Sequence, residues 1–499
     1  MTQQLLTDLQ DFLTSSATTV EWMSDDLREA VSIETSLEHV IAAAVAAKRT
    51  VVIAGTAGSG KTHLLRMAGQ LDGCQVIPDL AALPTTEWQD LFKKKSKVVV
   101  VAGNEGAFLS GAGIPGFDDI VASLHELQKG NDPQSNGAVV IDAAGYDPAG
   151  NHAIAKILQL PILKRYVESK GDHLLSAAWE MMSEEKVRRR IALLVEMASA
   201  QSELDGFTFR QIWKFVSDLV EGGTGVSALW FHRVFNGESE ISKKIAQSFN
   251  PNSLALPHIG NHLWHLDLEF IRDHMDESAI PILEQLMPLA IREKTDGARR
   301  ENVALLRQLA TFASRSSALE DRLERPQDLW NQIRKKQHGA LLSEINRYMT
   351  YGLLALGDHL ELWVQHDTER REIKPNVQIS LGTAPSDDFG LRRSVVIANP
   401  PPNVPQVEGG RLLLVHEKSE TSFPITKDLI DGLMRGRSHQ TKERRRVEYD
   451  WRLSRLFSAV SSQAARADSL KIAMFDFQAR TAFLVRWQVN GARIERLAI

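Results

Sequence analysis

The feature that constrains this chain most is a glycine-rich segment of eight residues near its beginning, Gly55-Thr56-Ala57-Gly58-Ser59-Gly60-Lys61-Thr62. It matches the phosphate-binding loop pattern G-x-x-x-x-G-K-[ST] at every position. A triphosphate carries dense negative charge that backbone N–H groups can meet only where side chains do not obstruct them. Glycine permits the backbone angles that point consecutive amides inward. The segment therefore predicts a cradle of main-chain donors for a polyphosphate.

The residues around this loop agree with that prediction. Residues 50–54 read as a buried parallel strand, and residues 62–68 have the apolar spacing of a helix. The positive end of that helix would face the phosphates. We expect Lys61 to reach the β- and γ-phosphates, Thr62 to ligate Mg²⁺, and His63 to complete the nucleotide-binding set. ATP and Mg²⁺ are the expected cofactors, although the loop does not distinguish ATP from GTP.

The same strand pattern recurs along the first third of the chain, at residues 50–54, 74–77, 97–102 and 138–141. A segment long enough for a helix separates each strand from the next. This alternation predicts an α/β fold with a parallel sheet in three layers and a ligand at the carboxyl ends of the strands. Residues 1–48 read as helices that pack beside this nucleotide domain.

An ATPase also needs a carboxylate near the metal and a group that activates water. Asp142 follows a hydrophobic strand and is the favoured metal-shell residue, although a strand-end aspartate is often only a cap or turn residue. Asn104 is the candidate γ-phosphate sensor, and Glu105 the candidate base. Asp79 is a third carboxylate option. If none is suitably placed, hydrolysis is expected to be slow and nucleotide binding itself to be the signal.

Composition limits the remaining choices. A length of 499 residues predicts two to four domains, and a formal net charge of −5 excludes a uniformly basic nucleic-acid coat protein. Cys74 is the only cysteine, which excludes an internal disulfide. No apolar run reaches the roughly 18 residues that span a bilayer. The start of the chain lacks the pattern of a secretion signal, so we expect a cytoplasmic protein without a membrane partner.

Several motifs in order along the chain resemble the AAA-like P-loop ATPases of bacterial antiphage defence systems. They are residues 55–62, Pro78-Asp79-Leu80, residues 101–106, Ile141-Asp142, residues 207–212, residues 230–232 and residues 249–251. The nearest comparison is the DptF-type ATPase subunit of phosphorothioation-dependent DNA restriction, and the similarity covers roughly residues 30–265. The resemblance implies ATP-dependent work against foreign DNA alongside other defence proteins, in a homo-oligomer or hetero-complex. The absence of a glutamate after Asp142 departs from the usual acidic pair.

The chain is expected to form four parts: residues 1–150 as N-terminal helices and ATPase core, 151–235 as a helical lid, 236–375 as a helical scaffold, and 376–499 as a small α+β module. In AAA-like proteins a lid arginine senses the γ-phosphate, and Arg210, after the capping residue Thr208, matches that position. Arg188-Arg189-Arg190 could supply an arginine finger to a neighbouring subunit, or could be a hydrated helix face.

The C-terminal module contains expected strands at residues 376–381, 394–398, 411–415, 471–477 and 481–489, with helices at 426–434 and 441–464. The basic stretch from Arg435 to Arg455 could contact DNA, or could be a solvated helix that pairs with an acidic partner. His258, His262 and His265 invite a metal interpretation, but surface or packing roles are favoured because no acidic or cysteine partner lies in a ligand pattern.

These observations favour an ATPase that assembles into a ring or partial ring and controls a DNA-directed defence complex. The alternative is a nucleotide-gated switch or loader with slow turnover that recruits an effector. A P-loop kinase for a small molecule is less favoured, because the lid and the long tail exceed its needs. We found no nuclease signature, so DNA cleavage would come from a partner.

Overall fold

The computed structural model describes residues 3–15, 23–91, 97–134, 137–150, 152–200, 206–254, 256, 259–292, 296–320, 323, 364–366, 369–371, 377–381, 389–416, 421–425, 469–476, 481–488 and 491–497. The chain forms two compact units. The first comprises Met1–Leu127, Asp132–Asp328 and Val395–Gly410, and the second comprises Gln128–Asn131, Leu329–Ser394 and Arg411–Ile499. The four-part division expected from the sequence stays a prediction.

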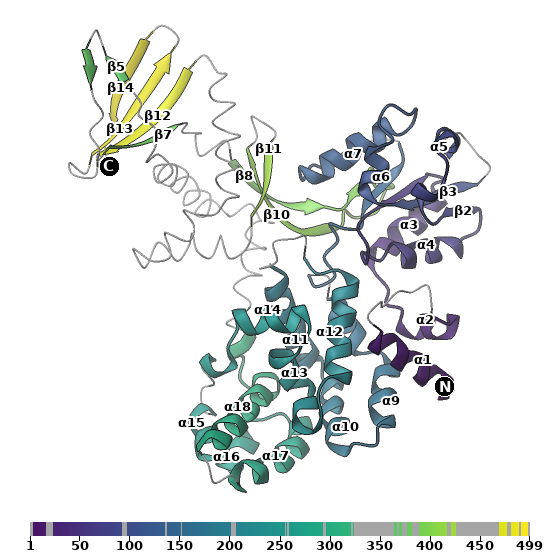
Figure 1. The fold of residues 1–499 in the computed structure, drawn as a ribbon, viewed down its shortest axis with the longest axis vertical. Coiled ribbons are helices and arrows are strands. Elements are labelled where there is room, and N and C mark those ends of the chain that lie inside the picture. The colour runs from purple at the N-terminus through teal and green to yellow at the C-terminus, as the bar shows by residue number, and fades with distance from the viewer. Residues whose placement is uncertain are drawn as a thin grey trace. The chain divides into compact units, whose positions relative to one another are not determined.

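A five-stranded sheet organises the first unit (Figure 1). Its strands are β1 (Val51–Ala54), β2 (Cys74–Ile77), β3 (Val98–Gly103), β4 (Val139–Asp142) and β9 (Ile397–Ala398), in the order β2-β3-β1-β4-β9. The four strands expected from the sequence are confirmed, and they pair in parallel. The register places Ala54 opposite both Gly103 and Asp142, so three strand ends meet beside the loop that follows β1.

The sheet is mixed, which corrects the expectation of a purely parallel one. Strand β9 pairs antiparallel with β4, through Val140 with Ala398 and Ile141 with Ile397. Residues 394–398 were expected as a strand of the C-terminal module, but this part of the segment completes the edge of the nucleotide sheet. The pairing joins residues more than 250 positions apart, which local sequence patterns do not reveal.

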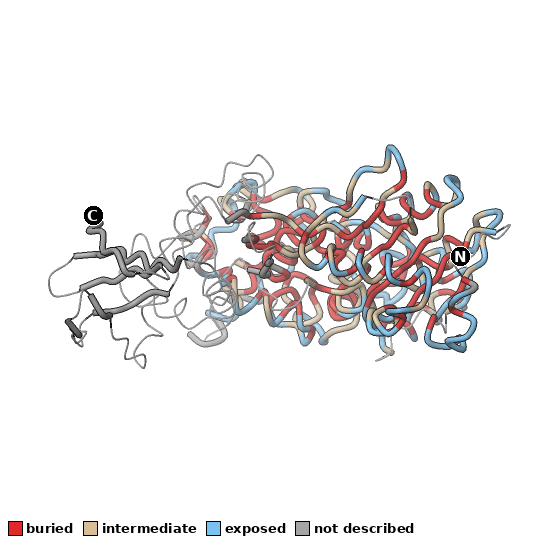
Figure 2. The backbone as a smooth tube through the Cα atoms, turned by 90° about the horizontal axis from the view of Figure 1, so that it is seen from above, coloured by how far each residue is buried: buried red, intermediate tan, exposed pale blue. Residues whose placement is uncertain are grey.

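Helices cover both faces of the sheet. On one face, α3 (Ser36–Ala46) and α4 (Lys61–Gly69) pack against Val51 and Ile53. On the other, α5 (Thr85–Leu91), α6 (Glu105–Leu109) and α7 (Asp118–Gln128) pack against Val52. The β1 side chains thus alternate between two cores, and all four residues of the strand are buried. This is the three-layer α/β arrangement expected from the alternating pattern. Figure 2 shows buried segments running through the middle of the described part of the chain.

The rest of the first unit is helical and shares a separate core. The helices that follow β4 are α8 (Ala153–Leu158), α9 (Pro161–Ser169), α10 (His173–Glu180), α11 (Glu185–Ala200), α12 (Phe209–Glu221), α13 (Trp230–Asn236), α14 (Glu240–Ser248), α15 (Gly260–His265), α16 (Leu268–Asp273), α17 (Ile280–Arg292) and α18 (Asp296–Ala313). Short 3₁₀ segments, η3 (Met181–Ser183), η4 (Gly225–Ala228), η5 (Pro251–Ser253) and η6 (Glu277–Ala279), connect some of them. The predicted helical character is confirmed for the part of residues 151–235 that the structure describes.

The N-terminal helices divide between the two cores. Helices α1 (Gln3–Thr14) and α2 (Asp25–Val31) bury Leu9, Leu27 and their apolar neighbours in the helical core, whereas α3 packs on the sheet. The Ser217 hydroxyl donates to the Leu13 carbonyl oxygen, which fastens α1 to α12. Residues 1–48 therefore pack beside the sheet only in part. We call the sheet with its covering helices the sheet body, and α1, α2 and α8–α18 the helical body.

The second unit contains antiparallel strands. One sheet has the order β14-β13-β12-β7 and is built from β7 (Val377–Leu381), β12 (Ser469–Asp476), β13 (Thr481–Gln488) and β14 (Gly491–Leu497). Other strands are β5 (Val364–His366), β6 (Glu369–Arg371), β8 (Phe389–Val395), β10 (Glu408–His416) and β11 (Thr421–Ile425). The predicted antiparallel sheet near the end of the chain is confirmed, but β5, β6, β11 and β14 were not predicted. The expected helices at 426–434 and 441–464, with the basic stretch from Arg435 to Arg455, lie outside the described residues.

Candidate functional site

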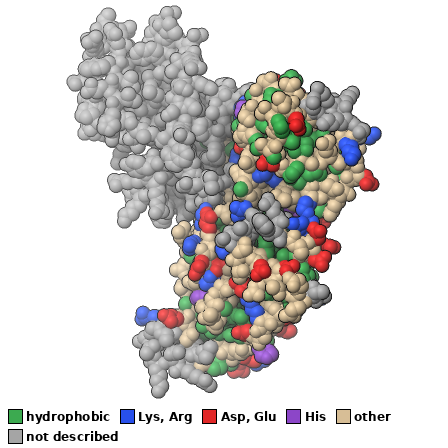
Figure 3. All heavy atoms as spheres, turned by 45° about the vertical axis from the view of Figure 1, so that its right-hand side comes forward, with side chains coloured by type: hydrophobic (Ala, Val, Ile, Leu, Met, Phe, Trp, Pro, Cys, Tyr) green, Lys and Arg blue, Asp and Glu red, His purple; other side chains and the backbone are tan. Residues whose placement is uncertain are grey.

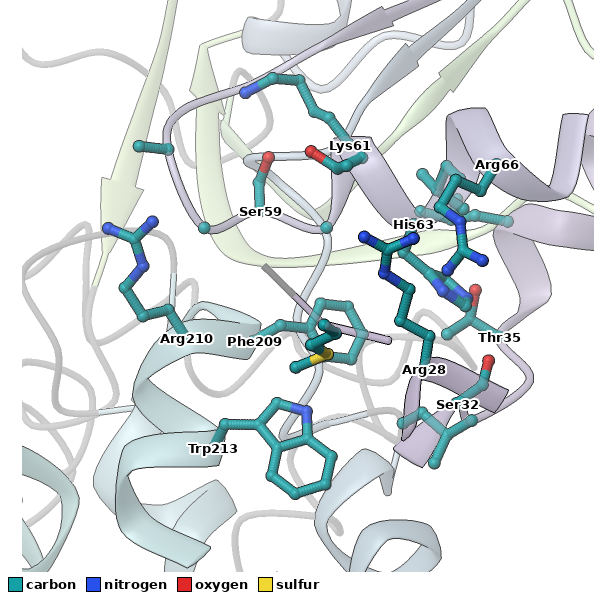
Figure 4. A pocket seen from close by; sticks show the side chains of 18 of the residues that line it. Arg28, Ser32, Thr35, Ser59, Lys61, His63, Arg66, Phe209, Arg210 and Trp213 are labelled. Atoms are coloured by element: carbon teal, nitrogen blue, oxygen red, sulfur yellow. The ribbon is translucent and has the colours of Figure 1, made fainter. Parts of the chain in front are cut away.

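A pocket of about 450 Å³ lies against the loop that follows β1 (Figure 4). The sheet body contributes residues 57–60, the start of α4, Pro78 and Asp79, and Gly103 and Asn104. The helical body contributes the end of α1, part of α2 with the segment after it, and the start of α12. The pocket therefore collects residues from both cores of the first unit.

The loop has the backbone form that its glycines predict. Gly58 and Gly60 have φ angles of +82° and +91°, in the left-handed region where other residues are strained. Gly60 is the N-cap of α4, so the amides at the start of this helix lie at the loop. The Gly55 N–H donates to the Gly103 carbonyl oxygen at 3.2 Å, which anchors the loop to β3. A Cβ at Gly55 would lie 2.7 Å from Ser59 Oγ and 3.2 Å from the Ala144 nitrogen, so glycine allows this close approach without displacing either group.

Lys61 holds its ammonium group over the loop. Its Nζ donates to the carbonyl oxygens of Gly55 and Thr56, both at 2.7 Å. Burial lowers the pKa of Lys61, and the negative charge of Asp79 opposes that shift. The neighbouring Thr62 is exposed in the first turn of α4. A cation and a hydroxyl are thus presented together at the loop, as the sequence pattern predicts.

The carboxylates are arranged differently from the favoured sequence interpretation. Asp79 and Asn104 line the pocket, whereas Asp142 and Glu105 are not among its lining residues. Asp142 Oδ1 accepts hydrogen bonds from the N–H groups of Ala144 and Gly145, both at 3.1 Å. This is the turn role that a strand-end aspartate often has.

Asp79 is exposed and is the N-cap of the 3₁₀ segment η2 (Leu80–Ala82), where one of its oxygens accepts from the Ala81 N–H at 3.1 Å. Of the options weighed from the sequence, the structure brings Asp79 and Asn104 to the lysine of the loop.

The lid arginine lies at the loop. Arg210 is in the first turn of α12, which begins with a capping box: the Gln211 N–H bonds Thr208 Oγ1 at 3.3 Å, and the Thr208 N–H bonds Gln211 Oε1 at 2.8 Å. A Cβ built on Gly58 would lie 3.0 Å from Arg210 Cβ, so this residue packs directly on the loop. Figure 4 shows its guanidinium group beside the loop. The cap fixes where α12 begins and therefore where Arg210 lies.

Two of the three arginines of α11, for which a finger and a hydrated helix face were the alternatives, are buried. Arg190 is fully buried; it donates to the carbonyl oxygens of Phe312 and Ser314 at 2.8 and 3.0 Å and pairs with Glu320 at 2.7 Å. Arg188 is also buried and donates to the Ser183 carbonyl oxygen at 2.6 Å. The finger prediction is therefore wrong for these two residues, which fasten the helical core. Only Arg189 of the three is exposed.

Several pocket residues were missed by the sequence interpretation. Trp213 lies one turn after Arg210 on α12, and its ring meets Phe12 edge to face with centroids 5.2 Å apart. Val31 and Ile33 add to this apolar end of the pocket. The helical spacing of Phe209, Arg210 and Trp213 could have indicated one shared face, but the contribution of α1 is a tertiary contact without a local signal.

Basic and imidazole side chains complete the rim. Arg28 of α2 and Arg66 of α4 both line the pocket and were not predicted. His63, which was expected to contact nucleotide, also lines it, but its Nε2 lies 2.9 Å from Glu38 Oε1. The same Glu38 oxygen accepts from the Thr35 N–H at 3.2 Å and so stabilises the start of α3. His63 therefore links α4 to α3 in this structure.

The histidines considered as metal ligands show no such arrangement where the structure describes them. His262 Nδ1 lies 3.1 Å from Asp267, and His258 lies outside the described residues. Across the described part of the chain, no group of three or more histidine, cysteine or acidic side chains could hold a metal ion. Among the helices that the structure describes, none combines the length and apolar composition needed to cross a bilayer.

Comparisons with protein-family models, with curated proteins and with solved structures give no match for this chain.

Proposed function

We propose that this protein is an AAA-like P-loop ATPase that binds ATP with Mg²⁺ in the pocket beside β1 and hydrolyses it. One observation carries the proposal: an unbroken phosphate-loop sequence whose two left-handed glycines, lysine and helix start lie together at the end of the central strand. The loop backbone therefore supports the proposal alongside the sequence, because left-handed glycines followed by a helix start are features of phosphate-binding loops.

The residues around the pocket fit a nucleotide. The volume of about 450 Å³ lies within the range of small-molecule sites. Lys61 and Arg210 supply positive charge at the loop for the phosphates, and Phe12, Trp213 and Ile33 supply an apolar surface for the base. A bound triphosphate would replace the Gly55 and Thr56 carbonyl oxygens as the partner of Lys61, because an ammonium pairs more strongly with an anion than with a neutral carbonyl.

We assign the metal-shell role to Asp79 and not to Asp142. One oxygen of each residue accepts from backbone amides, but Asp79 lines the pocket together with Thr62, whereas Asp142 does not line it. When bound, Mg²⁺ would neutralise phosphate charge and orient the phosphate chain. In this assignment Thr62 and Asp79 hold the ion and its waters, Asn104 donates to the γ-phosphate, and Arg210 reports whether that phosphate is present.

The alternative function, a nucleotide-gated switch or loader with slow turnover, has a specific observation in its favour. Asp79 is the only carboxylate among the described residues that line the pocket. If Asp79 serves the metal shell, no second lining carboxylate remains to activate water, and Glu105 would have to reach the site after a local rearrangement. Tight binding with slow hydrolysis would follow.

The biological setting that we propose is antiphage defence in the cytoplasm, as a subunit that acts on foreign DNA with partner proteins. This part rests on the motif resemblance described above. On the face drawn in Figure 3, basic and acidic side chains are interspersed over the described surface. We place any DNA contact in the stretch from Arg435 to Arg455, because basic residues predominate there in the sequence.

Steady-state phosphate release, measured with and without duplex DNA, tests the proposal. DNA-stimulated hydrolysis that requires Lys61 supports the ATPase. Tight ATP binding with negligible release under both conditions supports the switch. Failure to bind either ATP or GTP in the presence of Mg²⁺ would contradict both functions.

A further inference from the structure

An exposed acidic residue at the rim of the pocket contacts two of the pocket's arginines. Asp25 Oδ1 accepts from Arg28 Nη1 at 3.0 Å and from Arg66 Nη2 at 3.3 Å. Arg28 and Arg66 line the pocket, whereas Asp25 does not. Its side chain is 85% exposed, against 20% and 35% for the arginines. One carboxylate oxygen is therefore shared by two guanidinium groups that face the proposed ligand.

The two arginines come from different cores. Arg28 lies on α2, whose Leu27 and Val31 are buried in the helical body. Arg66 lies on α4, the helix that begins at the phosphate loop, and Leu64 and Leu65 of that helix are buried in the sheet body. In Figure 4 Arg28 extends from α2 toward the start of α4, and Arg66 extends from α4 back toward α2. The Asp25 oxygen thus bridges the helical body and the phosphate-loop helix.

We propose that Arg28 and Arg66 form a second anion subsite of the pocket, which takes a phosphate group of the nucleotide, and that Asp25 pairs with both arginines when the phosphate is absent. This inference rests on the proposed nucleotide function and adds the role of these three residues to it. Asp25 acts as an internal competitor for the ligand. Binding of the phosphate transfers both guanidinium groups from Asp25 to the nucleotide and keeps the two bodies bridged.

Charge and exposure determine which anion the arginines prefer. A carboxylate so exposed to water forms only a weak ion pair, because solvent screens it and because fixing the side chains costs entropy. A phosphate offers three acceptor oxygens and matches the planar fork of arginine, so it forms stronger, two-point contacts. The exchange therefore favours the nucleotide, but the contacts with Asp25 must be broken first. Removing the carboxylate should tighten binding.

The chain offers a closely matched control. Asp25 and Asp26 both lie in the first turn of α2 and are both exposed, but no hydrogen bond or ion pair between Asp26 and these arginines is found among the described residues. Asp25→Asn and Asp26→Asn make the same change in net charge and in the charge near the helix N-terminus. Any difference between them reports the contacts with Arg28 and Arg66.

The experiment is calorimetric titration of the full-length variants at low salt with ATP, AMP and adenosine. Asp25→Asn is expected to bind ATP and AMP roughly two- to fivefold more tightly than Asp26→Asn, the size of an exposed ion-pair effect. Adenosine should bind both variants equally, because it carries no phosphate. In an Arg66→Gln background, ATP should bind more weakly and the gain from Asp25→Asn should shrink.

Equal ATP affinities for Asp25→Asn and Asp26→Asn would overturn the subsite while leaving the proposed function intact. An equal gain for adenosine would also overturn it, because Asp25 would then obstruct the pocket without competing for an anion. If the wild-type chain binds ATP no better than adenosine, the proposed function itself fails and the subsite fails with it. Circular dichroism of each variant checks that the overall helix content is unchanged.

Discussion

The sheet body and the helical body contribute to the pocket in different ways. The sheet body supplies the main-chain cradle of the loop after β1, together with side chains that stand beside it at the start of α4 and after β2 and β3. The helical body supplies long side chains, among them Arg28, Arg210 and Trp213. The conformation of the loop backbone depends on the local sequence. The position of a side chain that reaches the loop from another core depends on how the two cores pack. The difference explains why the loop was predictable and most of its surroundings were not.

The largest expected effect is a loss of stability in the helical body that leaves the phosphate-binding loop unchanged. Arg190→Ala would leave Glu320 and four carbonyl oxygens without their buried cation, so we expect a loss of about 3–5 kcal/mol in the free energy of unfolding. Arg189→Ala, which alters an exposed neighbour on the same helix, is the control. Urea unfolding followed by tryptophan fluorescence measures both. A similar free energy of unfolding for the two variants would contradict a stabilising role for the buried contacts of Arg190.

The next prediction concerns a variant that impairs phosphate binding by the loop and leaves both bodies folded. Lys61→Ala removes the cation that lies over the loop, and we expect ATP affinity to fall by about a hundredfold or more, or roughly 3 kcal/mol. Lys97, exposed at the start of β3 and therefore at the opposite edge of the sheet, provides the matched control as Lys97→Ala. Equilibrium titration with a fluorescent ATP analogue measures binding. Undiminished affinity in Lys61→Ala would exclude this loop as the phosphate site.

A third comparison separates the two strand-end aspartates. Asp79→Asn should lower Mg²⁺-dependent hydrolysis about thirtyfold if it holds the metal shell, the loss expected for one well-placed charged contact. Asp142→Asn should change turnover little, because the replaced group mainly serves a backbone turn. Phosphate release across a magnesium titration gives both numbers. The reverse order of effects would restore Asp142 to the metal shell and require its turn to open.

The smallest of these effects tests whether Arg210 of the helical body detects the γ-phosphate of a nucleotide bound at the loop. Arg210→Gln should reduce the preference for ATP over ADP about tenfold, because one charge-assisted hydrogen bond to the γ-phosphate is lost. Lys214→Gln is the control on the same helix; Lys214 is exposed and does not line the pocket. Competition binding of ATP and ADP measures the preference. If both variants discriminate as the wild type does, Arg210 has only a packing role against Gly58.

Particular residues show where prediction from sequence succeeded. The strands were found because their apolar runs are short and bounded, and the cap of α12 because Thr208, a residue type that often caps helices, stands at the start of a helical pattern. Asp142 was favoured over Asp79 because its strand is more hydrophobic. Strand hydrophobicity indicates how deeply a strand is buried. It does not determine whether the side chain at the strand end lines the pocket or accepts hydrogen bonds from the backbone of the following turn.

Other features depended on contacts that are distant in sequence. The pairing of Ile397 with β4 and the burial of Arg190 against residues 311–320 leave no periodic signal. The sequence of a run of three arginines does not indicate which of their side chains are exposed to solvent and which are buried. Arg28 and Arg66 are candidate ligand-binding residues because α2 and α4 line the same pocket, and this arrangement has no local signal in the sequence.

The most direct test of the central claim is a structure of the protein with a non-hydrolysable ATP analogue and Mg²⁺. We predict that the β- and γ-phosphates lie in the loop of residues 55–62, with Lys61 Nζ moved from the Gly55 and Thr56 carbonyl oxygens onto them and Asp79 beside the ion. Nucleotide bound elsewhere at saturating concentration, with Lys61 still on those two carbonyl oxygens, would contradict the account.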